Sequence, residues 1–181
     1  MAKVYTVIIN GYPRAGKDLF AEYLRAAWNG PSAAISTVDT AKEIAKKYAG
    51  WNGGKGPKSR QFLSDLKSLL DEYAGVSLRD VSQCWCKIYE RARETELDGL
   101  LIVHCREAKQ IEMLRSILCA RDVYVVFLEN DKAKEVALRD QTNDSDRKVE
   151  ETQFDFLVKN NSSKSALRRE ANKLVKELEE E

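Results

Sequence analysis

The residues of this chain with the clearest chemical meaning are two glycines and a lysine close to its N-terminus. Residues 11–18 have the sequence GYPRAGKD and come directly after an apolar run, VYTVII at residues 4–9. In the spacing GxxxxGK, the glycines let backbone N–H groups surround a phosphate, and Lys17 reaches the β- and γ-phosphates of a nucleoside triphosphate. The motif therefore predicts a nucleotide-binding loop at the end of a strand.

This loop also predicts the cofactors. Where the motif ordinarily has a Ser or Thr hydroxyl that binds Mg²⁺, this chain has Asp18, whose carboxylate we expect to meet the ion through a water molecule. ATP and Mg²⁺ are thus the expected cofactors. The residues expected to bind them are Gly11, Arg14, Ala15, Gly16, Lys17, Asp18 and Leu19.

The composition restricts the classes of partner. At 181 residues the chain is expected to form one domain, and its net charge of +1 provides no basic field for nucleic-acid binding. Its apolar stretches have the length of strands rather than membrane spans, and we find no signal sequence. We expect a cytoplasmic monomer or homodimer with a small-molecule substrate and no nucleic-acid or membrane partner. Cysteine spacing indicates no metal site and predicts reduced thiols at Cys84, Cys86, Cys105 and Cys119.

Strand and helix patterns alternate along the chain, which favours an α/β fold with a parallel sheet covered on both faces. Apolar runs predict five strands, at residues 3–9, 33–38, 100–104, 123–128 and 154–159. One amphipathic helix follows the nucleotide loop, and another closes the chain. In such folds, ligands bind at the carboxyl ends of the strands.

An insertion between the second and third predicted strands, residues 39–97, is too long for one crossover helix. Its apolar spacing predicts three helices, at residues 39–48, around 62–73 and around 81–92. Ser77 and Asp80 resemble a capping box at the start of the third helix. The glycine-rich residues 50–57 indicate a mobile loop, which either contacts a ligand or serves only as a linker.

A protein that transfers a phosphoryl group must position phosphates with cations, so arginines near the strand ends are candidates. Arg106 follows the third strand directly and either binds a substrate phosphate or forms a surface ion pair. The polar residues 130–146 are typical of a lid or of a solvated charged loop. Arg139 and Arg147 lie in or beside this segment.

Two further side chains at the strand ends are candidates for catalysis. Asp39 follows the second strand and is either a base for a hydroxyl acceptor or a helix cap, whereas a phosphate acceptor needs no base. His104, the only histidine, ends the third strand and is either catalytic or a structural hydrogen-bonding group. That strand lacks the terminal Asp with which motor and switch NTPases hold Mg²⁺, which argues against those classes.

These features resemble the P-loop nucleoside monophosphate kinase superfamily, and more narrowly the deoxynucleoside monophosphate kinases of phages and their bacterial relatives. The resemblance rests first on the loop that ends Gly16-Lys17-Asp18. Further runs extend it over most of the chain, namely DTAKEIA at 39–45, KSRQFLSDLK at 58–67, VHCRE at 103–107, NDSD at 143–146 and FDF at 154–156. Leu19 departs from the family pattern, which often has a hydroxyl residue there.

The resemblance implies a three-layer α/β/α P-loop NTPase fold with a five-stranded sheet in the order 2-3-1-4-5. It implies a core at residues 1–38, 98–129 and 147–181, an acceptor-binding insertion at 39–97 and a short lid at 130–146. Asp39, Lys42, Arg60 and Arg106 would hold the acceptor. Arg139 would be the lid arginine, and Lys17, Arg106 and Arg139 would be the catalytic residues.

We therefore expect an ATP-dependent small-molecule kinase that transfers the γ-phosphoryl group to a nucleoside or deoxynucleoside monophosphate. Two alternatives stay open. One is a kinase for another small metabolite whose hydroxyl is activated by Asp39, and the other is a module that senses a nucleotide without rapid transfer.

Overall fold

The protein is built around a five-stranded parallel sheet. A computed structural model describes residues 2–54, 56–118, 122–139 and 152–180. The strand order is β2-β3-β1-β4-β5, as expected from the sequence, and all neighbouring strands run parallel. The strands are β1 (Val4–Asn10), β2 (Ser32–Ser36), β3 (Gly99–His104), β4 (Val123–Glu129) and β5 (Phe156–Lys159).

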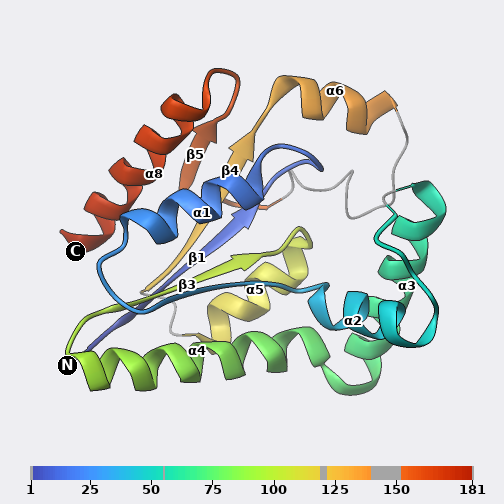
Figure 1. Cartoon of the computed structure of the whole chain (residues 1–181), viewed down its shortest axis with the longest axis horizontal. Helices are drawn as coiled ribbons and strands as arrows, with labels where there is room; N and C mark the ends of the chain where they lie inside the picture. Colours follow the sequence, from blue (N-terminus) through green and yellow to red (C-terminus); the bar gives the residue numbers. More distant parts are fainter. Residues whose placement is uncertain (1, 55, 119–121, 140–151, 181) are drawn as a thin grey trace.

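Helices cover both faces of this sheet, which confirms the predicted three-layer α/β arrangement (Figure 1). Each parallel strand needs a crossover to the next, and a helix is the usual one. The helices are α1 (Lys17–Ala27), α2 (Asp39–Tyr48), α3 (Pro57–Ala74), α4 (Val76–Thr95), α5 (Ala108–Ile117), α6 (Asp131–Arg139) and α8 (Lys164–Glu179).

The side chains of β1 point alternately to the two faces of the sheet. They therefore belong to two separate hydrophobic clusters, one on each face. Val7 and Ile9 pack on one face with Phe20 of α1 and Leu174 of α8. Ile8 packs on the other face with side chains of α4 and α5, such as Ile88 and Leu114. Since β1 is fully buried in the centre of the sheet, its carboxyl end is a fixed point of the structure.

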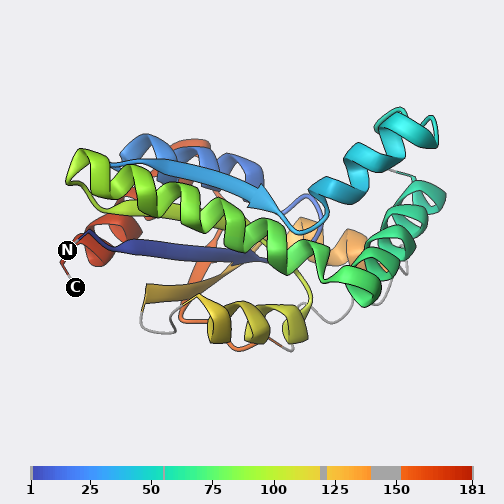
Figure 2. The same ribbon diagram turned by 90° about the horizontal axis from the view of Figure 1, so that it is seen from below.

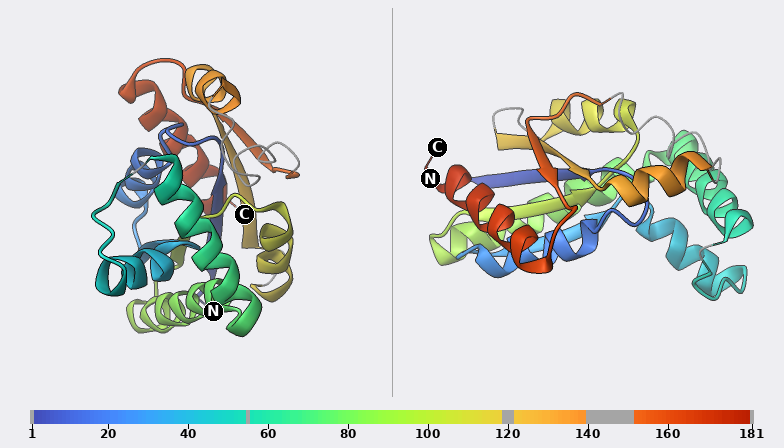
Figure 3. Two further views of the ribbon diagram at one scale, coloured as in Figure 1. Left: turned by 90° about the vertical axis from the view of Figure 1, so that its right-hand side faces the viewer. Right: turned by 90° about the horizontal axis from the view of Figure 1, so that it is seen from above.

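Helices α2 and α3 extend beyond the carboxyl ends of the strands, away from the end of the molecule where β1 starts and α8 finishes (Figure 2). Figure 3 shows the same two helices from the side and from above. The apolar stripe predicted for α3 lies on a real helix, but no residue of α3 is buried. In contrast, α4 runs along the sheet and buries Val81, Ile88 and Ala92.

One local expectation, the Ser77 cap, was wrong, and another, the lid, stays a prediction. Ser77 does not cap α4, because the cap position is occupied by Gly75, which also ends α3 with a φ of 56°. The segment expected to be a polar lid is helical over Asp131–Arg139, and Ala133 and Ala137 of this helix are buried in the core. The rest of the predicted lid, including Arg147, lies outside the described residues.

The remaining global expectations concern thiols and membranes. Cys105 is buried, Cys84 is half-buried and Cys86 is exposed, all as free thiols, whereas Cys119 lies outside the described residues. Within the part of the chain that the structure describes, no helix combines the length and the apolar character needed to cross a membrane.

Candidate active site

The nucleotide-binding loop lies between β1 and α1, where its two glycines adopt conformations that other residues avoid. Gly11 has a φ of 137° and Gly16 a φ of 98°. A Cβ atom on Gly11 would lie 2.4 Å from the carbonyl oxygen of Leu128, and one on Gly16 would lie 2.5 Å from Nδ2 of Asn160. Both positions therefore need glycine for backbone geometry and for space.

Two asparagines hold the loop against the sheet. Asn10 accepts the N–H of Gly11 through its side chain at 2.7 Å. Asn160, just after β5, donates from Nδ2 to the carbonyl oxygen of Ala15 at 2.8 Å. Ala15 is fully buried. These bonds connect the loop to the ends of β1 and β5, which are far apart in the sequence. The loop is therefore part of the core and not a free turn.

Lys17 is the first residue of α1, and its ammonium group folds back over the loop. Nζ donates to the carbonyl oxygens of Gly11 and Tyr12, each at 2.7 Å, and the residue is only 8% exposed. The cation is therefore held at the N-terminus of a helix, where backbone N–H groups also favour an anion.

Asp18 and His104 face one another across the mouth of the loop. The Asp18 carboxylate is fully exposed, and its Oδ1 lies 4.0 Å from Nδ1 of His104. Burial lowers the pKa of His104 below its ordinary value of 6.5, although the Asp18 carboxylate acts in the opposite direction. His104 is therefore mainly neutral at pH 7 and suited to hydrogen bonding rather than to carrying a charge.

Three strand ends meet at one level beside this loop. His104 of β3 pairs in register with Ile9 of β1 and with Ser36 of β2. The loop after β1, Asp39 after β2 and Arg106 after β3 consequently start at the same edge of the sheet, as the sequence predicted.

A cavity of about 570 Å³ opens at this edge, between the loop, the strand ends and helices α2 and α3. Its charged and polar lining comes from all three regions, and Trp51 and Leu63 add apolar surface. The lining residues are Pro13, Arg14, Lys17, Asp18, Ala34, Ile35, Ser36, Thr37, Val38, Asp39, Lys42, Trp51, Gly53, Gly54, Arg60, Leu63, Ser64, Lys67, His104, Cys105, Arg106 and Glu107.

Most of the predicted site residues therefore surround one cavity. Arg14, Lys17, Asp18, Asp39, Lys42, Arg60 and Arg106 line it. Gly11, Ala15 and Gly16 shape the loop behind it, while Leu19 packs against the hydrophobic core. Arg139 is exposed at the end of α6 and is not among the lining residues.

Asp39 is not the helix cap that the sequence suggested as one alternative. It is the first residue of α2, its cap position is occupied by Val38, and no side chain caps this helix. Its Oδ2 instead accepts the N–H of Ser36 at 2.8 Å, and its Oδ1 forms a 2.9 Å ion pair with Lys42. The carboxylate thus orients Lys42 at the cavity wall.

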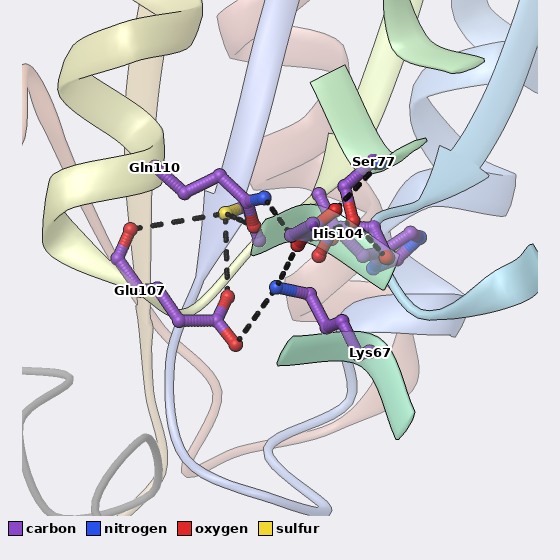
Figure 4. Close-up of polar contacts among 8 residues, drawn as sticks. Lys67, Ser77, His104, Glu107 and Gln110 are labelled. Atoms are coloured by element: carbon purple, nitrogen blue, oxygen red, sulfur yellow. Dashed lines mark hydrogen bonds and ion pairs between the residues drawn. The ribbon is translucent and has the colours of Figure 1, made fainter. Parts of the chain in front are cut away.

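A polar cluster that the sequence did not reveal joins α3 to the core (Figure 4). Lys67 Nζ lies 3.1 Å from Oδ2 of Asp71 and 3.4 Å from Oε1 of Glu107. Ser77 donates to Asp71 from its backbone N–H at 2.8 Å and from Oγ at 2.9 Å. Gln110 of α5 donates to the same carboxylate at 3.2 Å. The cluster fixes the helix that forms the outer wall of the cavity.

The opposite charges in this cluster shift the pKa values of Lys67 and Asp71. Burial alone would lower the pKa of Lys67, but the carboxylates of Glu107 and Asp71 outweigh it and raise the pKa above its ordinary value of 10.5. Burial would raise the pKa of Asp71, but the Ser77 hydrogen bonds and Lys67 outweigh it and lower the pKa below 3.8. Both groups are therefore ionised near neutrality.

The loop and the strand order together define a P-loop NTPase fold, with the cavity at the strand ends. No protein-family model matches the sequence, and a comparison with curated proteins finds no match either. Solved structures do match. A gluconokinase from Sinorhizobium meliloti 1021 is 16% identical with a TM-score of 0.54, and the alignment covers 99% of this chain and 96% of that one.

Two further solved structures agree with this fold. A dephospho-CoA kinase from Campylobacter jejuni is 16% identical, covers 97% of each chain and has a TM-score of 0.51. A sugar kinase from Janibacter sp. HTCC2649 is 12% identical, with 97% of this chain and 95% of that chain covered and a TM-score of 0.53. At these identities the likeness establishes the fold.

Proposed function

We propose that this protein is an ATP-dependent kinase that transfers a γ-phosphoryl group to a small phosphorylated acceptor, a nucleoside or deoxynucleoside monophosphate. One observation carries the proposal. A single cavity contains both the loop cations Arg14 and Lys17 and a second set of cations contributed by the strand ends and α2–α3, namely Lys42, Arg60 and Arg106. Two phosphorylated ligands can therefore be bound next to each other.

The second set of cations favours a phosphate on the acceptor. A phosphate monoester carries nearly two negative charges near neutrality, and guanidinium groups bind it through paired hydrogen bonds. Lys42, Arg60 and Arg106 line the cavity and are the cations that we assign to the acceptor, and Lys67 lines the same cavity in ion pairs with Asp71 and Glu107. A sugar hydroxyl alone would not need this concentration of positive charge.

The residues of the loop fit a magnesium ion held mainly by substrate. Mg²⁺ in kinases keeps several waters and binds one or two carboxylates together with the nucleotide phosphates. No group of three or more potential metal ligands occurs among the described residues, but the exposed carboxylate of Asp18 lies next to Lys17 at the cavity. Bound there, the ion would neutralise charge on the transferring phosphates.

The lid role of Arg139 stays a prediction. Ala133 and Ala137 anchor α6 in the core and leave Arg139 exposed at its end. If Arg139 stabilises the transferring group, its replacement by alanine will lower kcat and leave the affinity for ATP unchanged.

A second candidate is a kinase for a hydroxyl acceptor with Asp39 as base. Its support is the position of Asp39 on the cavity wall, together with the names of two proteins of similar fold, a gluconokinase and a sugar kinase. The contacts of Asp39 argue against it, because both of its carboxylate oxygens already have partners, Oδ1 in the 2.9 Å ion pair with Lys42 and Oδ2 in the hydrogen bond from Ser36.

The replacement Asp39→Asn separates these two candidates. A hydroxyl acceptor would lose its base, and kcat would fall about 10²- to 10⁴-fold. A phosphate acceptor needs no base, so we expect a fall in kcat of less than about 10-fold, with a higher KM for the acceptor because Lys42 loses its partner.

The experiment that tests the proposed function is an ADP-release assay over a panel of ribo- and deoxyribonucleoside monophosphates, with gluconate and other phosphate-free metabolites as the comparison. Rapid turnover of one or two monophosphates is expected. Turnover of only a phosphate-free acceptor would establish the second candidate. If no acceptor reacts while ATP raises the melting temperature, the protein is a nucleotide-sensing module.

A further inference from the structure

The three tryptophans of this chain occupy two kinds of environment. Trp28 belongs to one of the two hydrophobic clusters, and Trp85 packs against the other. Within the described part of the chain, Trp51 belongs to neither cluster but lines the cavity, where it is the one Phe, Tyr or Trp side chain. An indole ring outside the core is unusual, because it exposes a large apolar surface unless a ligand covers it.

Two hydrogen bonds, one from its backbone and one from its side chain, hold Trp51 in place. Its backbone N–H donates to the carbonyl oxygen of Ala45 at 3.0 Å, which joins the glycine-rich segment to the end of α2. Its Nε1 donates to the carbonyl oxygen of Gly54 at 3.2 Å. Because both donors have partners, the ring has a defined orientation and does not move freely with the glycines around it.

The ring also has a cation on one side. Lys46 Nζ lies 5.8 Å from the centroid of the Trp51 ring, in the range of a cation–π contact. Lys46 is not among the described residues that line the cavity, whereas Trp51 is. Trp51 thus contacts the Lys46 ammonium group and also contributes to the wall of the cavity.

The lining of the cavity combines charged side chains with apolar ones. Lys42, Arg60 and Arg106 suit a phosphate, whereas Trp51, with Leu63 of α3 on the same cavity, suits a flat apolar group. An acceptor that matches both has an anionic end and an aromatic heterocycle. Stacking on an aromatic side chain is the usual way to bind such a ring without regard to its hydrogen-bonding edge.

We propose that Trp51 is the residue on which the base of the acceptor stacks, so that this indole makes the site selective for nucleoside monophosphates over base-free sugar phosphates. This inference rests on the proposed function, because it assumes that the acceptor binds in the cavity. It assigns a ligand-binding role to the glycine-rich segment, which on sequence alone was either a contact loop or a linker.

The test is isothermal titration calorimetry of the full chain with two probes, a panel of deoxynucleoside monophosphates and 2-deoxyribose 5-phosphate, which has the phosphate and sugar but no base. In Trp51→Ala, the affinity for the preferred monophosphate is expected to fall about 5- to 150-fold. The affinity for 2-deoxyribose 5-phosphate is expected to stay the same. Trp51→Phe should keep most of the monophosphate affinity, because it retains an aromatic face although it loses the Gly54 hydrogen bond.

Two controls separate stacking from a structural role. Tyr73→Ala removes an aromatic ring of α3 that is 92% exposed and does not line the cavity, and it should change neither affinity. Quenching of tryptophan fluorescence by the monophosphate should occur in the wild type and be lost in Trp51→Phe, since Trp28 is buried, Trp85 packs against the other cluster and neither lines the cavity.

Three outcomes would overturn the inference. Equal loss of both ligands in Trp51→Ala would mean that the residue only shapes the loop. Unchanged monophosphate binding in Trp51→Ala would mean that the base lies elsewhere, with the proposed function intact. If the wild type itself binds no nucleoside monophosphate, the proposed function fails and the inference fails with it.

Discussion

The two walls of the cavity are built in different ways. The nucleotide-binding loop is part of the core, with Ala15 fully buried and Lys17 only 8% exposed. Helix α3, which forms the opposite wall, has no buried residue, and Phe62, Leu69 and Tyr73 are exposed on it. The first wall is held by backbone geometry and hydrogen bonds to strand ends, and the second by a small cluster of polar side chains.

This difference has a functional consequence. In the proposed kinase, phosphoryl transfer would depend mainly on positioning, so that the donor has to be held rigidly, whereas the acceptor has to enter and leave. A wall attached through Lys67, Asp71 and Glu107 has few apolar contacts to break when it moves. We therefore expect changes in the loop to have larger effects, on catalysis or on stability, than changes in α3.

The largest effect is expected from Lys17→Ala. Loss of this cation removes the group that the proposed function assigns to the β- and γ-phosphates, and we expect kcat to fall about 10³-fold or more. The ADP-release assay measures kcat, and circular dichroism checks the fold. Normal activity in a folded Lys17→Ala protein would rule out the loop as the catalytic donor site.

A second large effect is expected from Gly11→Ala, compared with Gly53→Ala. Gly11 has a φ of 137°, and its Cβ would lie 2.4 Å from a backbone oxygen, whereas Gly53 has a φ of 89° with no atom within 4 Å of its Cβ. The first variant should lose about 3 kcal/mol or more in the free energy of unfolding, and the second about 1 kcal/mol. Urea denaturation measures both.

Equal losses of unfolding free energy in Gly11→Ala and Gly53→Ala would contradict the idea that the loop is held more rigidly than the rest of the cavity wall. They would mean that the loop relaxes as easily as the glycine-rich segment, and that contact with β4 does not constrain it. Gly53→Ala measures the cost of a positive φ without a steric contact, so the difference between the variants reports the contact at Gly11 together with its less favourable φ of 137°.

The same contrast explains which features could be predicted from the sequence. The sheet, the loop and the ligand edge follow from local signals, since GxxxxGK, strand periodicity and the position of Arg106 are all readable within short windows. The cluster of Lys67, Asp71 and Glu107 could not be predicted in this way, because it joins residues that are up to 40 positions apart. In addition, charged residues on a helix usually indicate a solvated face.

Local sequence patterns gave one wrong expectation, the helix cap at Ser77, and did not reveal one helix, α6. Ser77 matches a capping pattern, but Gly75 ends α3 and starts α4 at once, so the Ser77 hydroxyl lies inside the helix and donates to Thr37 and Asp71. The polar run after β4 forms the helix α6, in which the residues that are buried are two small ones, Ala133 and Ala137. The spacing of these two alanines, one helical turn apart, was the available signal.

A smaller effect is expected from Asp71→Asn, which tests how α3 is attached. The variant leaves Lys67 with Glu107 as its carboxylate partner, and we expect the free energy of unfolding to fall by about 2 kcal/mol at pH 7. Asp65→Asn is the matched control, because Asp65 is exposed on the same helix and bonds only to Gln61 in the described structure. Its effect should stay within about 0.5 kcal/mol.

The pH dependence of this difference tests whether charge is responsible. The pKa of Asp71 is lowered in the folded protein, so its stabilising effect is complete above the unfolded value of 3.8 and disappears as the pH falls through the lower folded value. The difference in unfolding free energy between wild type and Asp71→Asn should therefore be constant from pH 7 to about pH 5 and shrink below pH 4. Urea denaturation at pH 7, 5, 4 and 3 measures it. A difference that stays constant down to pH 3 would mean that Asp71 holds α3 through shape and neutral hydrogen bonds, and that the outer wall does not depend on ionised groups.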